Sequence, residues 1–205
     1  MKKYIFLLDL LFYLVFPLLI WNVGRAYIGD YNSMLVSSIP GILYSIYRFY
    51  EIRKVNFTGI FIISTLIIGT LMDFLAGSAM QLLWNNVFFS IGMAGFYMTT
   101  ILINRPAAML LSLDLVEMRG NDRSITKDIF YQKHIFQVFQ GITLLFAFKE
   151  VVFSMIRVFL IQRYGVEAFD HGIIYRQILS WIFTLISVFG FIYIAKSFNE
   201  TRTVR

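Results

Sequence analysis

Apolar residues fall into six long blocks along this chain, separated by shorter polar segments. Most of these blocks approach the roughly 20 residues that a helix needs to cross about 30 Å of hydrocarbon, at about 1.5 Å per residue. We therefore predict an all-α integral membrane protein, a compact bundle of about six transmembrane helices in one polytopic domain, residues 1–205. The predicted spans are residues 4–23, 34–49, 57–72, 81–103, 135–161 and 178–195. The sequence leaves open whether the second span crosses fully, because Pro40 removes a backbone donor within it.

Positive charges are distributed unevenly between the two ends of the predicted spans. With a cytoplasmic N-terminus, the inner segments hold 13 of the 18 Lys and Arg residues, and the outer segments hold Arg25, Arg163 and Arg176. Lys149 and Arg157 lie inside the fifth span. Because Lys and Arg concentrate on the cytoplasmic side of membrane proteins, this bias predicts that both termini are cytoplasmic.

The composition agrees with a membrane protein. Hydrophobic residues make up 59% of the chain and charged residues 15%, against about 45–50% and about 25% in soluble domains. The net charge of +6 follows from the topology bias and adds attraction to anionic lipid head groups, so we expect no nucleic-acid partner. The chain has no cysteine and only two histidines, His134 and His171, which excludes disulfides, thiolate metal sites and a cysteine nucleophile.

The longest segment outside the predicted spans is residues 104–134, which we expect to be a cytoplasmic loop. Asn104-Arg105-Pro106 should end the fourth span, and residues 107–118 predict a short helix. That helix either lies in the head-group region or packs as a partly buried connector. After a turn at residues 120–122, Ser124 is predicted to be the N-cap of a further helix.

Lys149 and Glu150 stand side by side in the middle of the fifth span. Ionisable groups at that depth are costly, usually face a bundle interior or a wet cavity, and often have a function. Counted from the inner starts of their spans, Lys149 lies roughly 21 Å and Asp73 roughly 24 Å into the membrane. Since adjacent residues of a helix point about 100° apart, we expect Asp73 or Glu150 to compensate Lys149 across a helix contact.

Further polar residues lie in the same outer half of the predicted bundle. The proposed intramembrane polar site contains Asp73, Asn85, Asn86, Lys149, Glu150 and Arg157. The same residues are equally consistent with hydrogen bonds that only hold helices together, and the sequence does not separate the two hypotheses.

Motifs for common enzyme chemistry do not occur in the sequence. It contains no H-E-x-x-H, Walker A, G-x-S-x-G or G-x-G-x-x-G pattern. It also has no paired Asp-rich motifs and no histidine cluster for a metal or haem. We therefore predict no catalytic residues, no metal site and no cofactor, and the sequence leans away from an enzyme.

Three segments resemble the bacterial intracellular septation protein A family. They are the basic connection at residues 48–57, Asn104-Arg105-Pro106, and residues 130–157 with Lys149 and Glu150 followed by Arg157. The fifth span lacks a tryptophan and the loop is longer than in that family, which favours its wider group of uncharacterised six-span relatives. The resemblance implies a bacterial inner-membrane location and an envelope or division role, and it supplies no catalytic residues.

Together these observations predict a non-enzymatic multi-pass inner-membrane protein with a structural or interaction role in the envelope or in cell division. Its expected partners are the lipid bilayer and other membrane proteins or a second copy of the chain. One alternative is a small transporter with a polar path past Asp73, Lys149 and Glu150. Another is a membrane-embedded enzyme that acts on a lipid or isoprenoid head group.

Overall fold

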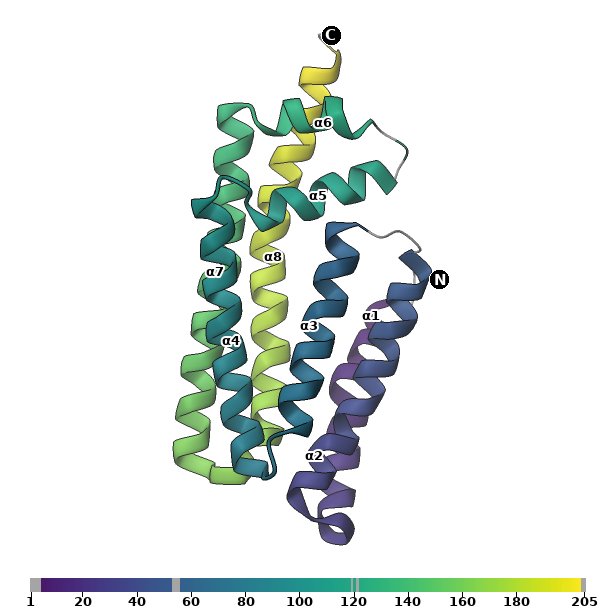
Figure 1. The fold of residues 1–205 in the computed structure, drawn as a ribbon, viewed down its shortest axis with the longest axis vertical. Helices are drawn as coiled ribbons and strands as arrows, with labels where there is room; N and C mark the ends of the chain where they lie inside the picture. The colour runs from purple at the N-terminus through teal and green to yellow at the C-terminus, as the bar shows by residue number, and fades with distance from the viewer. Residues whose placement is uncertain (1–4, 53–55, 119, 121, 204–205) are drawn as a thin grey trace. The chain divides into compact units, whose positions relative to one another are not determined.

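The structure, a computed structural model, describes residues 5–52, 56–118, 120 and 122–203, and these are almost entirely helical (Figure 1). Helices make up 93% of the described residues, and these contain no strand. The elements in order are α1 (Ile5–Leu10), a π-helical turn (Leu11–Val15), α2 (Phe16–Ile52), α3 (Phe57–Phe74), α4 (Ala79–Leu102), α5 (Ala107–Met118), α6 (Arg123–Phe130), α7 (Lys133–Tyr164), a 3-10 turn (Gly165–Glu167) and α8 (Ala168–Thr203). The predicted start of the first span at Tyr4, Lys54 in the basic connection, and Asn121 in the predicted turn lie outside the described residues.

The chain divides into two compact units. Unit 1 comprises Met1–Lys54, Gly59–Ser90 and Phe153–Ile178, and unit 2 comprises Val55–Thr58, Ile91–Val152 and Leu179–Arg205. The helices α3, α4, α7 and α8 each contribute residues to both units.

The first helical hairpin of unit 1 reverses direction inside α2. Gly29 has φ 77° and ψ 168°, outside the helical region, and a positive φ is a conformation that glycine adopts without steric cost. The two arms run antiparallel, because the Tyr13 hydroxyl lies 2.8 Å from the Ser45 hydroxyl and the Phe12 ring stacks on Tyr44 at 4.9 Å. The residue numbers in both pairs sum to nearly the same value, as an antiparallel hairpin centred near Gly29 requires.

The turns between α3 and α4 and between α7 and α8 also belong to unit 1. Gly77 and Gly165 have φ 70° and 59°, so each of these turns, like that at Gly29, uses a left-handed glycine. Trp21 and Met34 of the first hairpin are buried in one core with residues from the other two turns. That core is completed by Ala76, Ala79, Leu82, Leu83, Val87, Leu160, Ile161 and Ala168.

Unit 2 is built around α5, α6 and the parts of α7 and α8 that it contains. The axis bends by 80° between α4 and α5, where Asn104 has φ 55° and Pro106 precedes the new helix. Between Ala107 and Asp114, α5 is buried in unit 2 around most of its circumference, so the structure supports the connector alternative predicted for residues 107–118. Phe130, Ile135 and Phe139 form the middle of its core with Ala108, Met109, Leu113, Ile129, Ile142 and Ile194.

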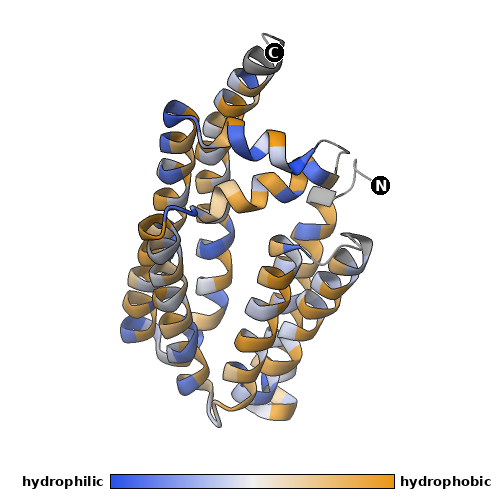
Figure 2. Ribbon diagram, turned by 45° about the horizontal axis from the view of Figure 1, so that its top comes forward, coloured by the Kyte–Doolittle hydropathy of each residue, from blue (hydrophilic) through white to orange (hydrophobic). Residues whose placement is uncertain are grey.

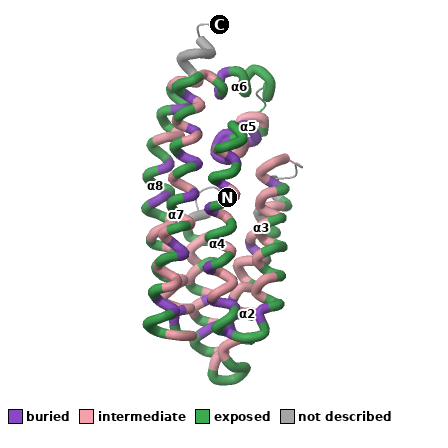
Figure 3. The backbone as a smooth tube through the Cα atoms, turned by 60° about the vertical axis from the view of Figure 1, so that its left-hand side comes forward, coloured by how far each residue is buried: buried purple, intermediate pink, exposed green. Residues whose placement is uncertain are grey.

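Many large apolar side chains of the long helices are exposed. Three continuous helical segments are long and apolar enough to cross a membrane, namely Leu7–Tyr47, Phe57–Phe74 and Lys133–Phe198, and α4 with α5 would make a fourth if the bent pair is one span. Only 6% of the most apolar window in Phe57–Phe74 is buried. Figure 2 shows apolar residues along nearly every turn of these helices, and Figure 3 shows many of those turns exposed. Extended exposed apolar surface is unfavourable in water but not in lipid, which indicates a membrane protein.

Candidate functional site

Four of the six predicted polar residues come together in unit 1, where α3 meets α4. Asn85 donates through Nδ2 to the Met72 carbonyl at 2.6 Å, and Asn86 donates through Nδ2 to Oδ1 of Asp73 at 3.1 Å. Both bonds cross the turn at Gly77, and the residue numbers in the two pairs sum to nearly the same value, as an antiparallel hairpin requires. Two amides thus fix the end of α3 against α4.

Arg157 connects α7 to the same place. Its Nη1 donates to the Asn86 carbonyl at 2.6 Å and to the Ser90 hydroxyl at 2.8 Å. Ser90 is buried and Arg157 is half-buried. We call Asp73, Asn85, Asn86, Ser90 and Arg157 the outer polar cluster, because it lies in the unit that holds the three hairpin turns.

A cavity of about 80 Å³ lies beside Arg157. It is lined by residues of α4, α7 and α8, including Asn86 and Arg176 as its further polar residues and Ile161 and Phe169 among its apolar ones. All the lining residues belong to unit 1. The sequence analysis did not select Arg176 as a site residue, because it lies just before the predicted sixth span and was counted only as a topology signal.

Lys149 and Glu150 lie in unit 2 and form an ion pair with each other. Lys149 Nζ is 3.2 Å from Glu150 Oε1, and the two side chains are 24% and 14% exposed. Glu150 therefore compensates Lys149 within one helix, and the expectation that it would do so across a helix contact is wrong. Although their Cβ atoms diverge by about 100°, both side chains have several rotatable bonds and bend until the charged groups meet.

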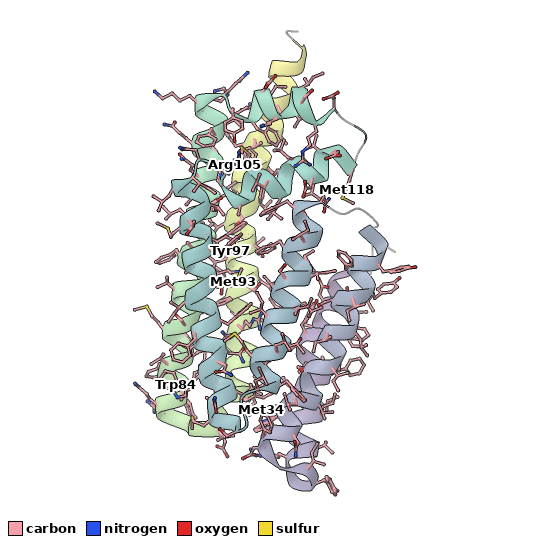
Figure 4. All side chains as sticks on the ribbon, in the orientation of Figure 1. Met34, Trp84, Met93, Tyr97, Arg105 and Met118 are labelled. Carbon is pink, nitrogen blue, oxygen red and sulfur yellow. The ribbon has the colours of Figure 1, made fainter. Side chains whose placement is uncertain are left out.

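The surroundings of this ion pair are partly aromatic. Tyr97, labelled on α4 in Figure 4, is buried, and its ring centroid lies 5.7 Å from that of Phe146 on α7. Phe148 packs edge-on against Phe183 of α8 at 6.2 Å. The Lys149–Glu150 ion pair lies in unit 2, whereas the outer polar cluster lies in unit 1.

A second polar cluster, in unit 2, was missed by the sequence analysis. Asp114 of α5 is only 1% exposed. Its Oδ2 accepts hydrogen bonds from the Thr58 backbone N–H at 2.7 Å and the Thr58 hydroxyl at 2.8 Å, and its Oδ1 accepts from Arg123 Nη1 at 2.8 Å. Arg123 also pairs with Glu117. The hydrogen bond to Glu117 and, to a smaller extent, that to Asp114 raise the pKa of Arg123. The available signal was the carboxylate of Asp114 between two leucines, Leu113 and Leu115.

The N-cap of α6 lies two residues before the predicted position. The N-cap is Asp122, not Ser124, because Asp122 Oδ1 accepts from the backbone N–H groups of Ser124 at 2.7 Å and Ile125 at 3.3 Å. The Ser124 hydroxyl also donates to this carboxylate at 2.6 Å. Asp and Ser are both common N-caps, and the backbone begins its helical turn one residue after Asp122.

Comparisons with known proteins give no family for this chain. No protein-family model, no curated protein and no solved structure matches it. Among the residues that the structure describes, no group of three or more His, Asp or Glu side chains is placed to hold a metal ion.

Proposed function

We propose that the chain is a six-span protein of the bacterial inner membrane. Leu7–Tyr47 has 41 residues, or roughly 60 Å of straight helix, about twice the hydrocarbon thickness. Its reversal at Gly29 supplies two spans from this one segment. Lys133–Phe198 has 66 residues, roughly 100 Å if straight, and the turn at Gly165 divides it in the same way. With α3 and α4 this makes six.

The proposed orientation has both termini in the cytoplasm. The three hairpin turns at Gly29, Gly77 and Gly165 would then face outward, and the segment that contains α5 and α6 would face inward. This assignment rests on the concentration of Lys and Arg in the segments assigned to the inside.

Within this topology we assign the protein a non-enzymatic role based on contacts between helices and with membrane partners. The observation that carries this assignment is that polar groups of different helices bind one another: Asn86 of α4 binds Asp73 of α3, and Arg157 of α7 binds Asn86 and Ser90 of α4. Polar residues used in this way hold helices together. The resemblance of residues 48–57 and 130–157 to the septation protein A group adds the envelope or division part of the proposal, and that part rests on sequence alone.

Reporter fusions test the orientation. A reporter that is active only in the cytoplasm should be active when fused after Gly120 and at the C-terminus, and inactive when fused after Glu167. A periplasm-specific reporter should give the opposite pattern. The reverse result at Gly120 would overturn the proposed orientation.

Gene deletion and complementation test the role. Deleting the gene in the bacterium that encodes it should lengthen the cells or weaken the envelope barrier to detergent, and the wild-type gene should restore both. A Lys149→Met, Glu150→Gln variant, which removes the charges in a balanced way, should also restore them if it reaches the membrane at the wild-type level. Normal insertion without complementation would instead favour the transporter hypothesis, and a deletion with no envelope or division defect would contradict the role itself.

A further inference from the structure

Two guanidinium groups line the cavity beside Arg157. Arg157 reaches it from α7 and Arg176 from α8, while Asn86 contributes an amide from α4. The Nη1 atom of Arg157 is held by the Asn86 carbonyl and the Ser90 hydroxyl. A guanidinium held in place by the protein loses little further freedom when it binds a ligand.

Arg176 is exposed at the edge of this cavity. It forms no hydrogen bond or ion pair with another residue in the part of the chain that the structure describes. The apolar walls that it shares, with Ile161 and Phe169, reduce the access of water and so strengthen electrostatic attraction inside the cavity.

The balance of charge favours an anion. Asp73 accepts its hydrogen bond from Asn86 and is not among the residues that line the cavity. The cavity walls carry two positive groups, Arg157 and Arg176, and the nearby carboxylate of Asp73 balances only one of them. Guanidinium groups present parallel N–H donors that match the oxygens of a phosphate or carboxylate.

The size and position of the cavity indicate which kind of anion it could bind. About 80 Å³ suits a group of phosphate size and is far below the roughly 300–1,000 Å³ of sites that enclose a whole drug-sized ligand. Arg157 and Arg176 lie 8 and 9 residues from the turn at Gly165–Glu167, or roughly 12–14 Å along their helices. Since α7 has 32 residues and a length of roughly 48 Å, it exceeds the hydrocarbon thickness of about 30 Å. Arginine side chains near such a helix end extend toward the head groups.

We propose that this cavity binds the phosphate group of an anionic ligand, held between Arg157 and Arg176. Phosphate binding follows from the cavity itself and does not depend on the proposed function. An anionic phospholipid is the source that the depth of the cavity favours, and this choice rests on the proposed membrane crossing of α7 and α8. A soluble phosphate compound has the same binding chemistry, and the two sources are separated by experiment.

The test uses the full-length protein, purified in a neutral detergent and unfolded by heat while its tryptophan fluorescence is recorded. Short-chain phosphatidylglycerol, inorganic phosphate and a diacylglycerol with the same acyl chains but no phosphate are titrated separately. A ligand that binds only the folded state raises Tm with concentration. Phosphatidylglycerol should raise Tm and the diacylglycerol should not; a rise with inorganic phosphate alone would assign the site to a soluble anion and would support phosphate binding without the lipid.

Three variants connect the effect to the cavity. Arg176→Gln should weaken binding about tenfold or more, because it removes a charged hydrogen-bonding group. Gly172→Leu should also weaken it, because Gly172 lines the cavity and a Cβ added there meets no atom within 4 Å, so the larger side chain would fill the space. Arg163→Gln, at an exposed arginine of α7 outside the cavity, should bind like the wild type.

Several outcomes would overturn the proposal. One is a wild-type protein whose Tm changes with neither phosphatidylglycerol nor phosphate. Another is a diacylglycerol that stabilises as strongly as phosphatidylglycerol, because the phosphate would then contribute nothing. Wild-type affinity in Arg176→Gln would also refute it. A failure of the topology fusions, by contrast, would remove the argument for a lipid source and leave the binding of phosphate standing.

Discussion

Replacing Asp114 with alanine should loosen the contact between α5 and the first turn of α3. The carboxylate of Asp114 is fully buried and accepts from the backbone N–H and the hydroxyl of Thr58 and from Arg123. The first N–H groups of a helix have no partner within the helix. Asp114 therefore acts as a cap for α3 that is supplied by a distant part of the chain.

The expected cost follows from what each partner loses. Arg123 keeps Glu117 and is 42% exposed, so its share is at most about 1 kcal/mol. Thr58 loses two hydrogen bonds to a charged acceptor, and a part-buried N–H without a partner costs about 1–3 kcal/mol. Asp114→Ala should therefore reduce the free energy of unfolding by about 1–4 kcal/mol, the sum of these two losses. Asp114→Asn, which retains an acceptor oxygen, should cost less.

Equilibrium unfolding in mixed micelles with increasing denaturing detergent gives the free energy, and hydrogen exchange at the Thr58 amide gives the local effect. Asp128→Ala is the matched control, since Asp128 is an exposed carboxylate of α6 and should change stability by no more than about 0.5 kcal/mol. Equal effects of Asp114→Ala and Asp128→Ala, or unchanged protection of the Thr58 amide, would refute this account of the cap.

Two further predictions concern helix packing and the cap of α6. Gly190→Ala should destabilise the protein by about 1–3 kcal/mol, because a Cβ there would lie 2.9 Å from Ile142. The control is Gly141→Ala, which should be neutral or slightly stabilising because no atom lies within 4 Å of the added Cβ. Equal effects of the two substitutions in thermal unfolding would contradict the packing argument. Asp122→Ala should lower Tm near neutral pH and progressively less in acid, because hydrogen bonds from the Ser124 hydroxyl and from the backbone lower the pKa of Asp122 below its ordinary value of 3.8. A carboxylate whose pKa is lowered in the folded state stabilises that state at pH values above its unfolded pKa. This stabilisation is lost as the pH falls through the folded pKa. A Tm difference between wild type and variant that does not shrink in acid would therefore exclude this cap.

The apolar pattern predicts the core of each long helix better than its ends. The fifth predicted span, residues 135–161, lies inside α7, and the sixth, residues 178–195, lies inside the much longer α8. Asp170 and His171 are polar, yet they continue the helix, because the backbone hydrogen bonds of a helix do not require apolar side chains. Hydropathy therefore measures the length of the apolar surface and not that of the helix.

Side-chain partners were harder to predict than helices. The sequence selected Asp73 and Asn86 as polar residues in apolar surroundings, but their shared register depends on the turn at Gly77, which fixes how α3 returns as α4. Lys149 and Glu150 were expected to diverge, because the estimate used helix geometry and left out side-chain length. Asp114 was missed because its partner Thr58 is 56 residues away, and a pairing over that distance has no local signal.

The hydrogen bonds of the outer polar cluster differ in the sequence separation of their partners, and therefore in when the two partners are synthesised. Asn86 and Asp73 are 13 residues apart, so α3 and α4 satisfy these polar groups as soon as their hairpin has formed. Arg157 is synthesised 71 residues after Asn86, and by then the acceptor carbonyl has long been in place. The order of synthesis therefore gives the chain an assembly order: α3 and α4 pair first, and the acceptors of Arg157 are already in place on α4 when α7 docks there.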